Sequence, residues 1–253
     1  MPYGRHGIEN HGISSVALRH FWVGHHYQGQ CPERAKNVFI GLDPNWDENI
    51  DDHLLGLIRD YFDNLEGFWD EHHEHHPLLV LGNGDGLTYH RNVRKLFNFK
   101  VGAGNWPALR TLVMSTSFVE LLGTPTYGNA TEHVPQYWDY LLDPNNIGFL
   151  QNVIVRQVFV PEHAPCPRKS VFIVGTGTVR KLLCLRDRRD RPQLDGALDF
   201  LDPLRDVPDQ NEARPIAPIF ETAGAVVYPM THFSAATGIS DAHLHAVADR
   251  LQL

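Results

Sequence analysis

Four apolar runs, separated from one another by helical patterning, constrain the fold of this chain more than any other feature. The runs are Val38–Asp43, Thr111–Glu120, Lys169–Gly175 and Gly224–His232. Short runs rich in β-branched and aromatic residues, with Gly or Pro at their ends, are typical of buried strands. Strands that alternate with helices favour a parallel sheet with right-handed crossovers. We therefore predict an α/β fold: a three-layer α/β/α sandwich with a central four-stranded parallel sheet.

Three further segments have the apolar spacing of amphipathic helices. Asp51–Trp69 repeats apolar residues on one face and begins with acidic residues, which interact favourably with a helix N-terminus. Thr176–Leu185 continues directly from the third run. Ser240–Leu251 begins with a serine suited to an N-cap and has an aspartate in its first turn. The stretch 186–218, rich in Arg, Asp and Pro, is predicted to be a surface excursion of a single domain that spans residues 1–253.

Composition sets limits on the class of protein. The 253 residues are 42% hydrophobic, enough to bury a full core, and the formal net charge is −8. Three cysteines lie far apart without a Cys-x-x-Cys pair, which argues against a zinc or iron–sulfur site and for a reducing compartment. No run has the length of a membrane span, and residues 1–10 are polar. We expect a cytoplasmic monomer with no cofactor and no membrane partner.

The first and last runs both end in polar side chains capable of catalysis. Asp43 closes the first run in the sequence Gly-Leu-Asp-Pro, and His232 closes the last. Ligands of open parallel sheets bind beyond the carboxyl ends of the strands, so we expect these two side chains to share one cleft. Asp-Pro is also typical of a helix N-cap or an Asx turn, and His232 also fits a hydrogen-bonded, partly buried histidine.

Four motifs together resemble those of the uracil-DNA glycosylase superfamily, over roughly residues 36–250. The family's first motif resembles Gly41-Leu42-Asp43-Pro44, and its His-Pro-Ser motif resembles His232-Phe233-Ser234. Its Gly-rich turn after the third strand resembles Val174-Gly175-Thr176-Gly177-Thr178-Val179. The end of its second strand, which reads the base, resembles Phe118-Val119-Glu120 with Pro125-Thr126.

The resemblance implies a DNA glycosylase whose partner is DNA that contains a modified base. Asp43 would stabilise the positive charge that builds on the sugar, and His232 the negative charge on the leaving base. The flipped base would contact Leu42, Asn45, Tyr89 and Glu120, and Tyr89 would provide a stacking surface worth about 1–3 kcal/mol. DNA phosphate would bind at Gly175, Thr176, Gly177 and Ser234, because the glycines open a helix. A tight turn without a ligand also explains the glycine pair, and a core aromatic also explains Tyr89.

Three positions depart from the family pattern. The residue after the motif histidine is Phe233 instead of Pro, and Asn45 replaces the usual Tyr. Glu120 stands where the uracil enzymes have an Asn amide, and a carboxylate can accept a hydrogen bond but cannot donate one. An insertion-like stretch at about residues 47–87 separates the first motif from Tyr89. The preferred base is therefore left open.

Two other functions compete with base excision. A superfamily member that binds a nucleotide, nucleic acid or protein without excising a base fits the negative net charge and Glu120. A metal-dependent hydrolase would use the run His72-His73-Glu74-His75-His76, in which His72 and His75 or His76 share a helical face. That run precedes a proline and lacks a clear third ligand, so we expect a solvated polar loop there.

Overall fold

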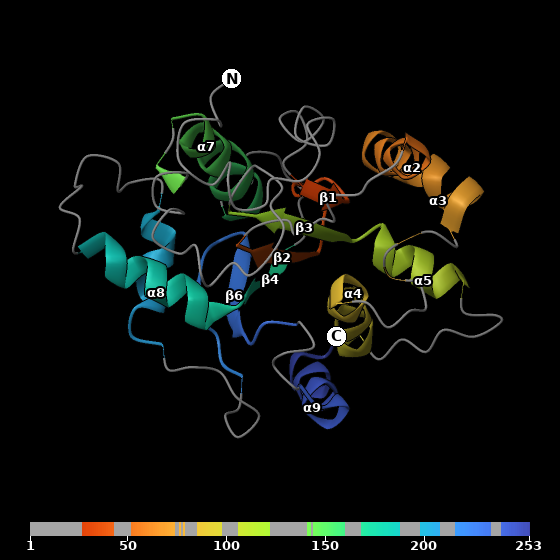
Figure 1. Cartoon of the computed structure of the whole chain (residues 1–253). Helices are drawn as coiled ribbons and strands as arrows, with labels where there is room; N and C mark the ends of the chain where they lie inside the picture. Colours follow the sequence, from red (N-terminus) through yellow and green to blue (C-terminus); the bar gives the residue numbers. More distant parts are fainter. Residues whose placement is uncertain are drawn as a thin grey trace.

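A six-stranded mixed sheet forms the centre of the computed structural model, with the strand order β1-β3-β2-β4-β6-β5 (Figure 1). The structure describes residues 27–42, 52–73, 76, 78, 85–97, 106–121, 141–142, 144–159, 168–187, 198–207, 216–233 and 239–253. The strands are β1 (Tyr27–Gly29), β2 (Asn37–Gly41), β3 (Thr116–Glu120), β4 (Lys169–Val174), β5 (Phe220–Glu221) and β6 (Ala225–Met230).

The pairing of the strands divides the sheet into an inner and an outer part. Strands β3, β2, β4 and β6 pair in parallel, whereas β1 and β5 pair antiparallel at the two edges. The predicted α/β class is confirmed, but the described sheet has six strands where four were predicted. The two edge strands are only three and two residues long, too short for an alternating apolar pattern to reveal them.

Helices cover both faces of the sheet (Figure 1), with α7 and α8 on one side and α4, α5 and α9 on the other. None of the described helices is long and apolar enough to cross a bilayer. The helical elements are α2 (Asp52–Asp63), α3 (Leu65–His72), α4 (Asp85–Leu96), α5 (Trp106–Val113), α7 (Pro144–Phe149), the π-helix η4 (Leu150–Phe159), α8 (Thr176–Asp187), the 3-10 helix η6 (Asp199–Leu204) and α9 (Asp241–Leu251).

Alternate residues of the central strand β2 belong to two separate apolar clusters. Val38 and Ile40 pack into a cluster that includes residues of η4, α8 and η6. Phe39, between them, packs into a cluster that includes residues of α4, α5 and α9. Because side chains of a strand alternate between its two faces, the continuous apolar run at 38–40 reflects burial on both sides.

A row of aromatic rings crosses the four parallel strands on one face. The ring of Phe39 stacks on Phe118 with centroids 5.5 Å apart and on Phe172 at 4.9 Å. Phe172 in turn stacks on Tyr228 at 5.7 Å. Each pair lies directly opposite in the strand register. A slip of one residue would turn a ring to the other face, so the row fixes the register of all four strands.

Two predicted elements have different boundaries in the structure. The single helix expected over residues 51–69 is divided at Asn64, whose side chain accepts a hydrogen bond from the Gly67 N–H at 3.1 Å and begins α3. The strand expected from Thr111 is helical as far as Val113 and becomes extended only at Thr116.

The C-terminal helix was predicted correctly, and the surface excursion only in part. Ser240 is the N-cap of α9, and its hydroxyl accepts a hydrogen bond from the His243 N–H at 3.2 Å. Within the segment 186–218, η6 and its flank bury Leu198, Leu201 and Leu204. Their spacing of three residues matches the period of a 3-10 helix, which places all three on one face.

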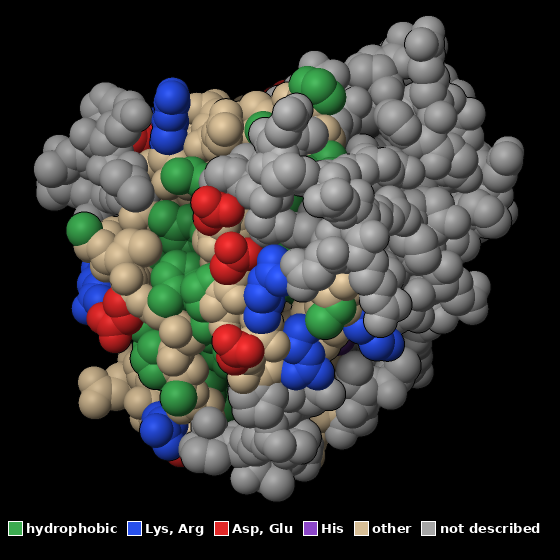
Figure 2. All heavy atoms as spheres, turned by 90° about the vertical axis from the view of Figure 1, so that its left-hand side faces the viewer, with side chains coloured by type: hydrophobic (Ala, Val, Ile, Leu, Met, Phe, Trp, Pro, Cys, Tyr) green, Lys and Arg blue, Asp and Glu red, His purple; other side chains and the backbone are tan. Residues whose placement is uncertain are grey.

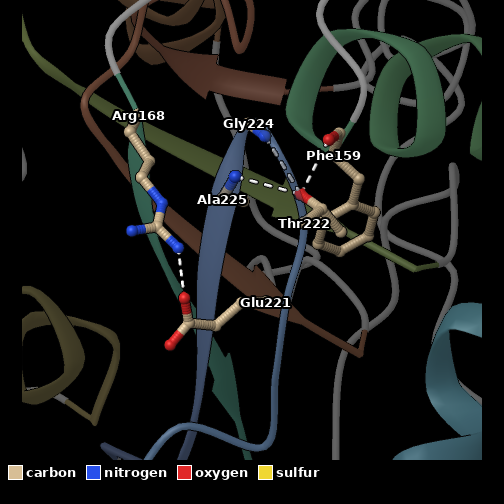
Figure 3. A network of polar contacts seen from close by, with 6 residues as sticks. All are labelled: Phe159, Arg168, Glu221, Thr222, Gly224 and Ala225. Carbon is tan, nitrogen blue, oxygen red and sulfur yellow. Dashed lines mark hydrogen bonds and ion pairs between the residues drawn. The ribbon is translucent and has the colours of Figure 1, made fainter.

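A polar network holds the β5–β6 hairpin to the end of η4 (Figure 3). The Thr222 hydroxyl donates to the Phe159 carbonyl at 2.8 Å and accepts from the Ala225 N–H at 3.0 Å. Next to it, Arg168 forms an ion pair with Glu221. The hairpin lies at the amino end of β6. The network therefore fixes the end of the sheet that lies opposite the carboxyl ends of the parallel strands.

One member of the histidine run, His76, is buried and does not belong to the solvated loop that we expected. His76 is 1% exposed, and its ring lies against Tyr61 at 5.2 Å and Trp69 at 5.7 Å between centroids. Its Nδ1 accepts a hydrogen bond from the Leu78 N–H at 3.1 Å, which requires a neutral ring. Burial, with a smaller contribution from His90, lowers the pKa of His76 to about 3.

We predict that His76→Asn removes a pH dependence of stability. The unfolded chain takes up a proton at His76 below the ordinary pKa of 6.5, whereas the folded protein does not until about pH 3. Stability contributed by the neutral ring is therefore present above pH 6.5 and is lost as the pH falls, by up to about 1.4 kcal/mol per unit. Denaturant unfolding between pH 7 and pH 4 measures this slope. The exposed His245→Asn is the control, and an unchanged slope in His76→Asn would contradict the prediction.

Candidate functional site

The order of the strands marks the carboxyl edge of the sheet as the place for a ligand. From β2 the chain continues to β3 on one side and then crosses to β4 on the other side of β2. Where neighbouring parallel strands connect in opposite directions, their loops separate and leave a crevice beyond the carboxyl ends. Gly41 ends β2 and Val174 ends β4, so the first motif and the Gly-rich turn flank this point.

Glu120 occupies space that a side chain on β2 would otherwise fill. It lies opposite Gly41 in the parallel register of β2 and β3. A Cβ atom at Gly41 would lie 2.1 Å from the Glu120 Oε2 atom, which is buried. The glycine of the first motif therefore allows the carboxylate to lie across the end of β2.

His232 lies against the turn that follows β4. Gly175 in this turn has a φ of 78°, and a Cβ atom there would lie 3.3 Å from the His232 Cδ2 atom. The Gly175 N–H donates to the Met230 carbonyl at 3.0 Å. The Thr176 hydroxyl donates to the Ile173 carbonyl at 3.0 Å and accepts from the Met230 N–H at 3.2 Å. The end of β6 is therefore hydrogen-bonded to this turn.

Tyr89 of α4 connects these two parts of the site. Its ring contacts His232 at 6.0 Å, Phe233 at 5.6 Å and Phe118 at 6.2 Å between centroids. Burial and the charge of Glu120 raise the pKa of Tyr89 well above its usual range, so its hydroxyl stays protonated. One ring therefore lies near the predicted base-reading carboxylate and the predicted catalytic histidine.

The protonation states define what the site can bind. The His232 ring has exposed surface, yet the surrounding protein desolvates it enough to lower its pKa below 6.5. At neutral pH the imidazole is therefore neutral, with one donor and one acceptor nitrogen. A Glu120 carboxylate accepts hydrogen bonds, and Tyr89 offers an aromatic surface. This set of groups suits a planar heteroaromatic ligand that carries N–H donors.

The structure brings together four of the predicted site residues: Glu120, Tyr89, His232 and Gly175. Leu42 follows β2 directly and is buried, and Gly177 lies in the first turn of α8. The side chain of Thr176 is turned inward: this residue is 1% exposed and its hydroxyl is used within the protein. Asp43, Asn45 and Ser234 lie outside the described residues.

Sequence reasoning missed two residues of α4 that adjoin the site. The ring of His90 lies 5.3 Å from Phe118 and 5.4 Å from Tyr89. The Asn92 side chain donates to the Phe233 carbonyl at 3.0 Å. Tyr89 and Asn92 are three residues apart and so share a helix face, a spacing that marks both once α4 is recognised.

Comparison of the chain with protein-family models, with curated proteins and with solved structures gave no match in any of the three. Among the described residues, no group of three or more His, Cys, Asp or Glu side chains is arranged to hold a metal ion. The resemblance to the glycosylase superfamily therefore rests on the motifs themselves.

We predict that Gly175→Ala destabilises the protein and displaces His232. A non-glycine residue at positive φ costs about 1–2 kcal/mol, and the new methyl group would press on the imidazole. Denaturant unfolding and the NMR signals of His232 measure the two effects. Gly56→Ala is the matched control, because a methyl group there meets nothing within 4 Å and favours α2 by up to about 1 kcal/mol. A Gly175→Ala variant as stable as the parent would exclude this role for the turn.

Proposed function

We propose that this chain is a DNA glycosylase that hydrolyses the N-glycosidic bond of a flipped, modified base, as a divergent member of the uracil-DNA glycosylase superfamily. The observation that supports this most is the cluster of Glu120, Tyr89 and His232 at the carboxyl edge of the sheet. The proposal includes the three-layer α/β/α sandwich with its four central parallel strands, which the two apolar clusters support.

The proposed reaction separates charge between the sugar and the base. The C1′–N bond breaks with its electron pair moving to the base, a water oxygen bonds to C1′ and loses a proton to solvent, and the base anion takes up a proton from solvent as it leaves. Asp43 stabilises the cationic sugar and orients the water, and His232 donates a hydrogen bond to the anionic base. A neutral imidazole suits this role, because its N–H donor is fixed before the charge develops.

Recognition of the base is assigned to Tyr89 and Glu120 and, from the motif resemblance, to Leu42 and Asn45. The Tyr89 ring supplies a stacking surface, and the Glu120 carboxylate accepts from an N–H of the base. The N–H groups at the start of α8, with Gly177 and Ser234, bind DNA phosphate in this proposal. The Thr176 hydroxyl already binds the end of β6, which leaves its backbone as the contributing part.

The side of α8 does not offer a uniformly basic surface to DNA. Figure 2 shows the described part of that side, where acidic and basic side chains both flank an apolar strip. The net charge of −8 gives no general attraction to a polyanion. Affinity in the proposal therefore comes from the base pocket and a few phosphate contacts.

The decisive experiment incubates the full chain with oligonucleotides that contain uracil, hypoxanthine, xanthine or oxidised pyrimidines, single- and double-stranded, and scores abasic sites. Release of free base that is insensitive to chelator supports the proposal. Binding of these oligonucleotides without base release would favour a member that only binds, and release abolished by chelator would favour a metal-dependent hydrolase.

We predict that Asp43→Ala and His232→Ala each slow base release by about 10²–10³-fold and leave DNA affinity nearly unchanged. Interactions that strengthen only in the transition state lower the rate without weakening binding. Single-turnover rates on the best substrate, with binding measured separately, provide the test. Base release at the parent rate in both variants would exclude these residues from the chemistry.

We predict that Glu120→Asn changes which base is released more than it changes stability. An amide donates as well as accepts, so bases with a carbonyl at the contacted position gain relative to bases with an N–H. Gly41→Ala is a companion variant, because its methyl group displaces the same carboxylate without altering its chemistry. Equal loss on every substrate, together with a large fall in melting temperature, would mean that Glu120 is structural.

A further inference from the structure

Two buried asparagines, one on each side of the sheet, bind the backbone just beyond two residues of the candidate site. Asn92 of α4 is 5% exposed, and its side-chain N–H donates to the Phe233 carbonyl at 3.0 Å. Asn146 of α7 is 2% exposed, and its side-chain N–H donates to the Leu121 carbonyl at 3.1 Å. Phe233 follows His232 in the chain, and Leu121 follows Glu120.

Each of these peptides is also held from a second direction. On the side of His232, the Met230 carbonyl accepts from the Gly175 N–H at 3.0 Å, so the segment is bound both before and after the histidine. On the side of Glu120, the Leu121 N–H donates to the Gly41 carbonyl at 3.0 Å. The backbone on which each functional side chain stands is therefore fixed on two sides.

Both asparagines make long-range contacts, and Asn146 also donates to the nearby Leu141 carbonyl at 3.4 Å. Each joins a helix to a peptide that lies beyond the end of a strand, across 141 residues for Asn92 and 25 for Asn146. Buried polar side chains are costly unless they are bonded, and an apolar side chain would fill these positions if packing were the only demand. Their placement after Glu120 and His232 points to positioning of these two side chains.

We propose that Asn92 and Asn146 are positioning residues, Asn92 for the imidazole of His232 and Asn146 for the carboxylate of Glu120. The catalytic meaning of this inference rests on the proposed function. Its structural content, that each asparagine controls one functional side chain and not the other, is independent of any substrate.

The test uses Asn92→Ser and Asn146→Ser in the full chain. A second pair, Asn92→Leu and Asn146→Leu, has side chains of similar length and removes the donor without adding a charge. Asn37→Ser is the matched control, because Asn37 is also buried but lies at the amino end of β2. NMR titrations follow the imidazole of His232 and the carboxyl carbon of Glu120, each assigned with a His232→Gln or Glu120→Gln variant. Near-UV circular dichroism identifies which member of each pair is folded, and that member is used.

The expected result is a separation of the two effects. The Asn92 variants move the pKa of His232 towards 6.5, because release of the segment gives water more access to the ring. They leave the Glu120 titration unchanged, and the Asn146 variants do the reverse. With a substrate from which the parent protein releases a base, the Asn92 variants lower the single-turnover rate of base release by about 10–100-fold with little change in binding. The Asn146 variants instead change the ratio of the release rates of two different bases.

Two results would overturn the inference. One is a folded Asn92 variant whose His232 titration matches that of the parent and of Asn37→Ser. The other is a change of both titrations to the same extent in every variant, which would mean that the asparagines only stabilise the fold. Absence of base release from all substrates would count against the proposed function alone, because the titrations need no substrate.

Discussion

The register of the parallel strands is the constraint on which the candidate site depends, and stacked rings set it. Phe118, Phe39, Phe172 and Tyr228 form one row across the strands β3, β2, β4 and β6. Because neighbouring rings must stay opposite, the ends of the strands are fixed relative to one another. Glu120 therefore meets the glycine of the first motif, and the turn after β4 meets the end of β6. The geometry of the candidate site therefore depends on ring contacts within the sheet.

The fold was predictable from the sequence where a pattern was long and buried on both faces. The four apolar runs gave the parallel strands, and Ser240 gave the start of α9. The aromatic residue near the middle of each parallel strand was a further signal of how the strands are aligned. It can be interpreted only when the runs are compared with one another. Edge strands of two and three residues carry too little pattern to detect, and the break at Asn64 depends on a single capping hydrogen bond.

The candidate site was predictable at the ends of strands and not where a helix completes it. Glu120 and His232 follow from position in an apolar run, because the end of a strand is visible in the sequence. The contacts of His90 and Asn92 with the site depend on α4, a helix whose polar composition gave no apolar pattern in the sequence. The sequence also did not reveal that the Thr176 hydroxyl points inward. A threonine after a glycine gives the same sequence pattern whether its hydroxyl bonds a ligand or the neighbouring strand.

The outer strands of the sheet affect how the chain meets other copies of itself. At one edge β1 offers three residues and at the other β5 offers two. A sheet recruits a foreign strand through a long row of exposed peptide groups, and edges this short present few of them. Parallel sheets in general pair slowly, so partly folded chains expose strand edges for longer. We expect edges this short to limit aggregation during folding.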